Sequence, residues 1–81
     1  MIPVKICGIT KLEDAQAAVR SGASALGFIF YDKSSRYIPI KTAYQIASIV
    51  QGQVPLVGVF VDETLDYVNK VAKEIGLNFI Q

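Results

Sequence analysis

The stretch Met1-Ile-Pro-Val-Lys-Ile-Cys-Gly-Ile-Thr10 indicates the fold and contains one chemically reactive side chain. The apolar residues on either side of Lys5 predict a short buried strand, and Gly8 follows that strand directly. Cys7 is therefore expected at the carboxyl end of the first strand. Parallel α/β proteins bind their ligands at the carboxyl ends of their strands. This position makes Cys7 the first candidate functional residue.

Beyond this stretch, strand and helix patterns alternate to the end of the chain. We expect strands at about residues 4–8, 25–31, 55–61 and 77–81, and helices at about residues 11–21, 40–51 and 64–75. Each interval between strands has room for one crossover helix, and this alternation implies a parallel sheet. The sequence thus predicts an α/β fold with a single domain over residues 1–81.

Local signals predict where two of the helices begin and one of them ends. Thr10 and Glu13 form a T-x-x-E capping box before the first helix. Asp62 or Thr64 is expected to cap the third helix, and for Asp62 a capping role is favoured over a functional one because it directly precedes the helical pattern. Gly76 suits a left-handed residue that closes the third helix.

The composition is unusually apolar for a chain of this length. Hydrophobic residues make up 52% of the 81 residues. A domain of this size buries only roughly 60% of the surface of its unfolded chain. The excess of core-type residues suggests part of a larger structure, or an oligomer.

Charge and rare residues exclude several functions. Eight Lys and Arg residues balance seven Asp and Glu residues, and no basic tract marks a nucleic-acid or membrane partner. No apolar run has the length of a membrane span, and no signal peptide is expected. One cysteine and no histidine argue against a metal site, and the single cysteine suits a reducing cytoplasm.

Cys7 and Lys5 are expected on the same face of the first strand, because side chains alternate along a strand. A lone cysteine on a buried strand is by itself a small apolar residue. If both side chains face the interior of a barrel, however, Cys7 lies at its functional rim. A nearby ammonium group would then favour the thiolate and make it usable as a base.

Arg36 is the second candidate, in the loop that follows the second expected strand. It is either a solvated loop charge or a guanidinium that binds a carboxylate or phosphate through two parallel hydrogen bonds. The position of the loop after a parallel strand favours binding. Asp32 is expected to be solvated, and Asp62 and Glu63 follow the third strand at the same edge.

Four segments of the chain resemble phosphoribosylanthranilate isomerases of tryptophan biosynthesis. They are Val4-Lys-Ile-Cys-Gly-Ile-Thr10, Gly27-Phe-Ile-Phe-Tyr-Asp-Lys-Ser-Ser-Arg-Tyr37, Val57-Gly-Val-Phe-Val61 and Leu77-Asn-Phe-Ile-Gln81. The first two are specific to the family, and the other two are weak alone. Asp32 stands where the family often has proline, and Asp62 where asparagine is common.

The resemblance implies the N-terminal (βα)3β4 half of a TIM (β/α)8 barrel. It also implies a cofactor-free Amadori rearrangement of N-(5-phosphoribosyl)anthranilate, in which an aspartic acid opens the sugar ring to a Schiff base. The residue matching Cys7 then removes the C2 proton as general base. The residue matching Arg36 binds the anthranilate carboxylate, and Lys5 is expected to support the thiolate.

In this family the general acid and the phosphate-binding loops come from later strands, so the 81 residues are expected to be inactive alone. We expect them to associate with a complementary C-terminal half-barrel or with themselves. Two alternatives stay open at this stage. One is a non-catalytic half-barrel that acts as an assembly or folding module, and the other is a flavodoxin-like binding module, which ordinarily needs about five strands.

Overall fold

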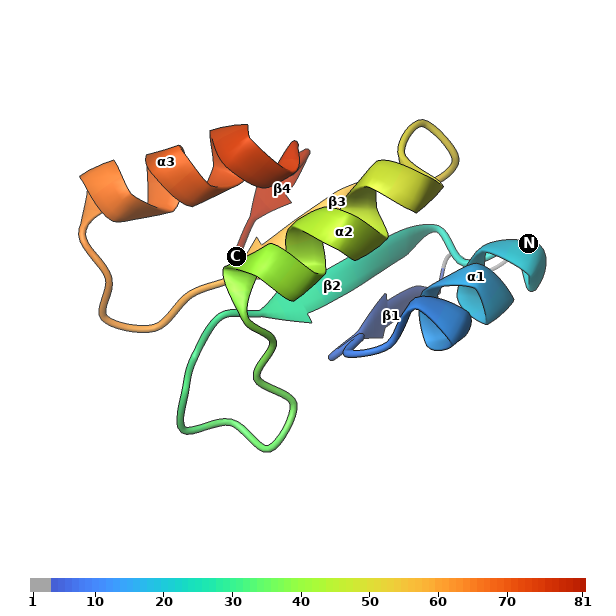
Figure 1. Cartoon of the computed structure of the whole chain (residues 1–81), viewed down its shortest axis with the longest axis horizontal. Helices are drawn as coiled ribbons and strands as arrows, with labels where there is room; N and C mark the ends of the chain where they lie inside the picture. Colours follow the sequence, from blue (N-terminus) through green and yellow to red (C-terminus); the bar gives the residue numbers. More distant parts are fainter. Residues whose placement is uncertain (1–3) are drawn as a thin grey trace.

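A computed structural model describes residues 4–81, in which four strands alternate with three helices (Figure 1). The elements are β1 (Lys5–Cys7), α1 (Leu12–Arg20), β2 (Ala25–Ile29), α2 (Ile40–Val50), β3 (Leu56–Val59), α3 (Leu65–Ile75) and β4 (Phe79–Ile80). Each lies inside its expected range and is shorter at one or both ends. Ladder hydrogen bonds continue past the strand ends, since the Phe30 N–H donates to the Val59 carbonyl.

The four strands form one parallel sheet in the order β1-β2-β3-β4. This confirms the predicted parallel α/β fold. Each connection leads to the neighbouring strand, and crossovers of this kind are almost always right-handed. When successive crossovers have the same handedness and each moves toward the same edge of the sheet, their helices lie on one side of it. Figure 1 shows α1, α2 and α3 on that same side.

The core lies between the helices and this covered face of the sheet. Leu26 and Phe28 of β2 have no exposed surface, and Leu56 of β3 is also buried. Helix α2 faces the core with buried residues at helical spacing, which are Ala43, Ile46, Ala47 and Val50. Helix α3 does so with Val68, Val71 and Ile75. Apolar residues at these spacings form a continuous stripe, and its burial holds the helices on the sheet.

The other face of the sheet carries the functional candidates. The strand register aligns Cys7 with Gly27, Gly27 with Val57 and Val57 with Phe79, so these residues point to the face away from the core. Lys5 shares this face, and its amine donates a hydrogen bond to the side chain of Gln81.

This contact joins the two outer strands of the sheet. Three spacings of about 4.8 Å separate β1 from β4 across a flat sheet. The Lys5 side chain therefore reaches the far edge because the sheet curls toward this face, which is the concave face of the molecule.

One predicted helix cap is wrong, and for another the structure selects one of the two candidates. Helix α1 begins after Lys11, which has no side-chain cap, so Thr10 and Glu13 do not form the capping box. Thr10 lies one residue outside the cap position, where its hydroxyl cannot serve the first turn. Thr64 rather than Asp62 caps α3, because its hydroxyl accepts the N–H of Tyr67 at 3.2 Å.

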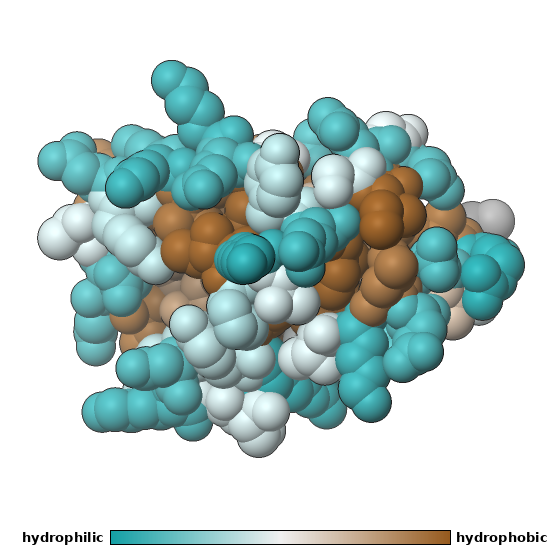
Figure 2. Space-filling model, in the orientation of Figure 1, coloured by the Kyte–Doolittle hydropathy of each residue, from teal (hydrophilic) through white to brown (hydrophobic). Residues whose placement is uncertain are grey.

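Among residues 4–81, no helix is both long and apolar enough to cross a membrane. Figure 2 shows hydrophilic residues along most of the outline, with hydrophobic residues visible in furrows between them. On helix α2, Tyr44 and Ile49 are about half exposed.

Candidate active site

The thiol of Cys7 lies at the end of β1, half-buried and free of any disulfide. Its neighbour across the sheet is Gly27. A Cβ atom on Gly27 would lie 2.9 Å from the Cys7 Sγ, closer than real contacts allow. The absence of a side chain on Gly27 therefore leaves the room that the thiol occupies.

The backbone beyond Cys7 is fixed to β2 by two hydrogen bonds. The N–H groups of Gly8 and Ile9 both donate to the Gly27 carbonyl, at 3.0 and 3.1 Å. Gly8 has a φ of +84°, a left-handed conformation that L-residues other than glycine rarely adopt. Ile9 then enters the core, with only 3% of its surface exposed. The end of the strand that carries the thiol is thus held in one geometry.

The loop after β2 is also held at its base, and it carries Arg36. The Ile38 N–H donates to the Ile29 carbonyl at 3.1 Å, and the Ile38 side chain is buried. Within the loop, the Arg36 N–H donates to the Ser34 hydroxyl at 3.1 Å. These contacts bring the loop back across the end of β2.

As a result, the side chain of Arg36 packs against the backbone of Gly8. A Cβ atom on Gly8 would collide with the Arg36 Cδ and would lie 3.2 Å from its Nη1. The guanidinium therefore lies beside the residue that directly follows Cys7. The structure brings the two main sequence candidates together at the carboxyl edge of the sheet.

Lys5 lies two residues before Cys7 in β1, and its side chain shares the concave face. Its amine hydrogen bonds to the Gln81 side chain, on the opposite side of that face. The expected support of the Cys7 thiolate by Lys5 therefore stays a prediction.

The acidic residues at this edge are exposed. Asp62 has a positive φ of 54° in the loop between β3 and α3, two residues before the Thr64 cap.

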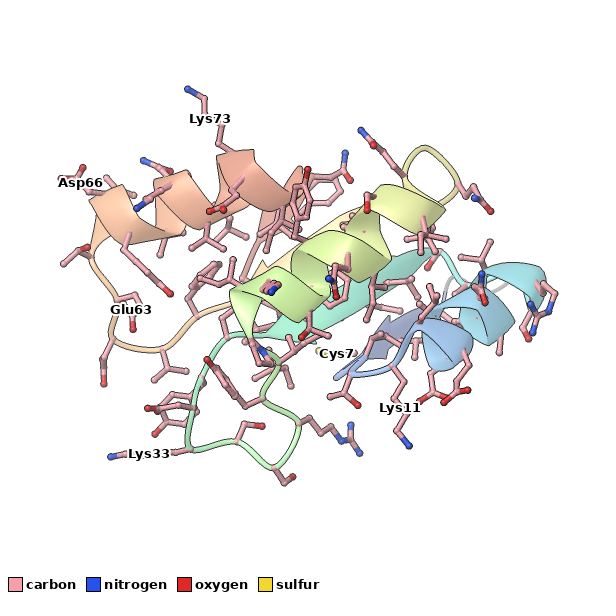
Figure 3. All side chains as sticks on the ribbon, viewed as in Figure 1. Cys7, Lys11, Lys33, Glu63, Asp66 and Lys73 are labelled. Carbon is pink, nitrogen blue, oxygen red and sulfur yellow. The ribbon has the colours of Figure 1, made fainter. Side chains whose placement is uncertain are left out.

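Partial burial raises the pKa of the Tyr67 phenol, and the negative charge of Glu63 raises it further. In Figure 3, Lys33 projects away from the body of the molecule, whereas Cys7 lies within it. No group of three potential metal ligands occurs among residues 4–81.

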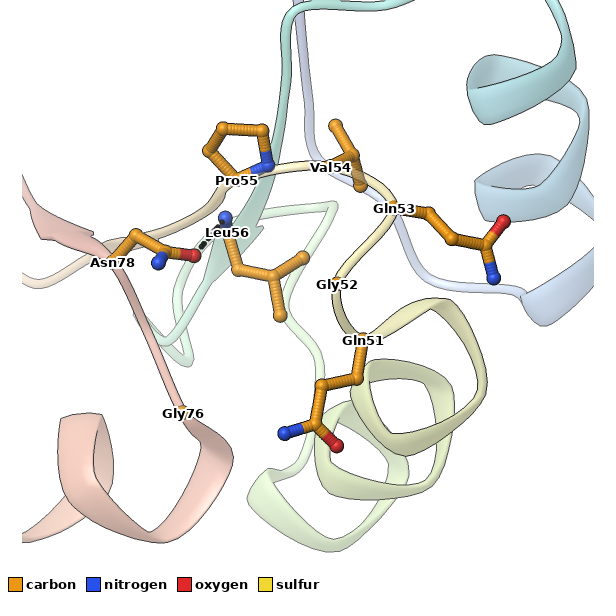
Figure 4. Close-up of a pocket in the computed structure, with 8 residues that line it drawn as sticks. All are labelled: Gln51, Gly52, Gln53, Val54, Pro55, Leu56, Gly76 and Asn78. Atoms are coloured by element: carbon orange, nitrogen blue, oxygen red, sulfur yellow. Dashed lines mark hydrogen bonds between the residues drawn. The ribbon is translucent and has the colours of Figure 1, made fainter.

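A depression of about 470 Å³ opens at the opposite edge of the sheet, where β3 and β4 begin (Figure 4). The Asn78 side chain accepts the Leu56 N–H there, at 2.8 Å. Its lining contains no charged residue and none of the candidates, and consists of residues 51–56, Gly76 and Asn78. In parallel barrels, residues at this amino-terminal edge serve stability, and the carboxyl edge holds the chemistry.

These features define a class of protein: part of a parallel α/β barrel with a thiol and a guanidinium at its functional edge. The family described as "N-(5'phosphoribosyl)anthranilate (PRA) isomerase" matches residues 4–81. The chain belongs to this family. An N-(5'-phosphoribosyl)anthranilate isomerase of Geobacter sp. (strain M21) is 52% identical over 81 residues, which are all of this chain and 40% of the relative.

Solved structures agree with the family assignment. The phosphoribosylanthranilate isomerase of Thermotoga maritima superposes with a TM-score of 0.96 at 49% identity, over 100% of this chain and 40% of that one. A second structure of such an enzyme, with reduced 1-(o-carboxyphenylamino)-1-deoxyribulose 5-phosphate, has the same TM-score and identity, with 42% of its chain covered. These enzymes are TIM barrels, so the present chain forms a half-barrel and spans about 40% of their length.

The sequence predicts Cys7 and Arg36 as candidates but not the two glycines that they contact. The apolar pattern predicts Gly8 as the end of the first strand and Gly27 only as a residue inside the second. Their close contacts join the first strand to residues some 20 to 30 positions further along. The signal available in the sequence was a glycine directly after the candidate base and another inside an apolar strand, where glycine often marks a close approach.

Proposed function

We propose that the protein carrying these residues is a phosphoribosylanthranilate isomerase, and that residues 1–81 form the N-terminal half of its barrel. The observation that supports this most is the packing of Arg36 against Gly8, next to Cys7. It brings a guanidinium close to the strand end that carries a thiol, which supports the proposed roles of Cys7 as base and Arg36 as anion-binding group. The substrate proposed for this edge is N-(5-phosphoribosyl)anthranilate, whose ring carries a carboxylate.

In the proposed reaction, an aspartic acid from another part of the barrel opens the furanose ring to a protonated Schiff base. Cys7, as thiolate, takes the proton from C2. The electrons of the C2–H bond form a C1–C2 double bond, and the nitrogen receives the displaced pair. The resulting enolamine tautomerises to the ketone. The reaction moves protons within one molecule, so its balance requires no redox cofactor.

Arg36 is proposed to orient the substrate through its anthranilate carboxylate. A guanidinium presents two parallel N–H donors to a carboxylate, and such paired, charged hydrogen bonds are stronger than neutral ones. Lys5 is proposed to support the Cys7 thiolate through the positive charge of its ammonium group. We propose that the enzyme acts in the cytoplasm, where a free thiol such as Cys7 stays reduced.

A hybrid enzyme tests this proposal. In it, residues 1–81 replace the matching 40% of the Thermotoga maritima enzyme, and the remaining strands supply the rest of the barrel. We expect this hybrid enzyme to convert N-(5-phosphoribosyl)anthranilate to product. Liquid chromatography measures the conversion. A folded hybrid enzyme without activity would contradict the proposal and would favour a non-catalytic folding or assembly module.

Replacing Arg36 by Lys in the hybrid enzyme is expected to raise KM even though the positive charge is kept. The ammonium of Lys cannot form the paired hydrogen bonds, and hydrogen bonds to charged groups contribute about 1.5–3 kcal/mol. The expected rise in KM is therefore roughly 10-fold or more.

Lys33→Ala is the matched control, since Lys33 belongs to the same loop and projects away from the site (Figure 3). It should leave both KM and kcat unchanged. With a substrate analogue that lacks the carboxylate, the hybrid enzyme and its Arg36→Lys variant should have the same KM. Unchanged kinetics in both Arg36→Lys and Arg36→Ala would show that the loop carries only a solvated charge.

A further inference from the structure

We propose that Gly8 is a positioning residue for Arg36. Its missing side chain sets where the guanidinium lies relative to Cys7, and hence how the substrate carboxylate is held above the base. This inference rests on the proposed function and adds to it a residue that touches neither the reacting atoms nor the carboxylate.

The first argument is steric. Three atoms of Arg36 lie within 3.4 Å of the position that a Cβ on Gly8 would take, and the nearest is Cδ, in the middle of the side chain. Real Cβ atoms essentially never approach another atom as closely as this Cδ. Any residue larger than glycine therefore displaces the Arg36 side chain from its path beside the end of β1.

The second argument is that the surroundings give Gly8 little freedom to move away. Its N–H donates to the Gly27 carbonyl at 3.0 Å, and the Ile9 N–H shares that acceptor. On the other side, Arg36 belongs to a loop whose base is held by Ile38 on the Ile29 carbonyl. A side chain on Gly8 would thus act mainly on the outer part of Arg36, because both backbones are held.

Gly22 provides a matched control for the backbone conformation. Its φ is +83°, against +84° for Gly8, so an alanine at either position meets the same left-handed strain. No atom lies within 4 Å of a Cβ on Gly22. The difference between Gly8→Ala and Gly22→Ala therefore isolates the contact with Arg36.

The experiment compares four variants of the hybrid enzyme: Gly8→Ala, Gly22→Ala, Arg36→Ala and the Gly8→Ala/Arg36→Ala double variant. Each is titrated calorimetrically with reduced 1-(o-carboxyphenylamino)-1-deoxyribulose 5-phosphate, and its thermal midpoint is measured. We expect Gly8→Ala to weaken binding by roughly 10- to 100-fold, as loss of a charged hydrogen-bond pair does. Gly22→Ala should change the Kd by less than about twofold, as should Gly8→Ala in the Arg36→Ala background.

Thermal unfolding gives a second readout that does not depend on ligand. Gly8→Ala should lower Tm more than Gly22→Ala, and the double variant should recover to the level of Gly22→Ala, because truncation of Arg36 removes the colliding atoms. If Gly8→Ala does not fold but the double variant does, the proposal is supported. If neither folds, the defect does not act through Arg36 and the proposal is overturned.

The remaining outcomes separate this inference from the proposed function. If the hybrid enzyme is active and needs Arg36, but Gly8→Ala and Gly22→Ala have equal Kd values, the role of Gly8 is overturned and the proposed function is not. An undiminished effect of Gly8→Ala in the Arg36→Ala background would have the same consequence. An inactive parent hybrid would instead contradict the proposed function, and the Tm comparison would still decide whether Gly8 and Arg36 are coupled.

Discussion

Replacing Cys7 by Ser in the hybrid enzyme is expected to lower kcat by roughly 10²–10⁴-fold, the usual contribution of a positioned general base. A serine hydroxyl ionises far less readily than a thiol, so it cannot take the C2 proton at neutral pH. The substitution is nearly isosteric, and a serine hydroxyl fits the space over Gly27 that the thiol occupies. We therefore expect little change in Tm.

Steady-state kinetics with Cys7→Ser and Cys7→Ala check this result. Both variants should lose turnover to a similar extent. They should keep their affinity for reduced 1-(o-carboxyphenylamino)-1-deoxyribulose 5-phosphate, because Arg36 is unchanged. Near-normal turnover in either variant would show that Cys7 is only a small apolar residue and not the base. A large loss of Tm together with activity would show a structural role instead.

The 81 residues expressed alone are expected to have no isomerase activity and to self-associate rather than remain monomers of 8.8 kDa. The outer edges of β1 and β4 have no neighbouring strand among the described residues, and such edges pair readily with other chains. The concave face is open at its β4 edge, where Phe79 is 61% exposed. Apolar surface and open edges together favour association.

Light scattering at micromolar concentration measures the association. Mixing the 81 residues with the remaining part of the Thermotoga maritima enzyme, as a separate polypeptide, should restore activity, because the second part covers both edges. A stable monomer that gains no activity on mixing would contradict the half-barrel interpretation. The 81 residues with Cys7→Ser are the control: they should assemble with the second part but stay inactive.

The fold was predictable from sequence because its signals are local and repeat along the chain. Apolar strands alternate with helices whose buried residues recur at helical spacing, as in α2, and this alternation leads to a parallel sheet with little ambiguity. The position of Cys7 at a strand end followed from the same pattern. Arg36 could be singled out because its loop follows a strand of that sheet.

The features that sequence reasoning missed depend on contacts between distant residues or on single-residue shifts. The contact of Gly8 with Arg36 requires the loop after β2 to fold back, and no local pattern shows that. Lys5 also contacts Gln81 across the curled sheet, and no local pattern in the sequence shows this contact. The capping box failed because α1 begins one residue later than Thr10 would require.

The resemblance to phosphoribosylanthranilate isomerases supplied what the residues alone could not, namely the reaction and its substrate. Composition and spacing by themselves reach only an α/β chain with one candidate thiol and one candidate guanidinium. The structure adds that Arg36 packs against Gly8, the residue that follows Cys7, and the family model matches residues 4–81.

A crystal structure of the hybrid enzyme with reduced 1-(o-carboxyphenylamino)-1-deoxyribulose 5-phosphate tests the central claim most directly. That claim is that residues 1–81 supply both the base and the carboxylate-binding group of one active site. We predict two N–H···O contacts of about 2.7–2.9 Å between the Arg36 guanidinium and the carboxylate, the distance typical of charged pairs. We also predict that the Cys7 Sγ faces C2 of the sugar. A carboxylate bound by other residues, with Arg36 in solvent and Cys7 turned from C2, would contradict the claim.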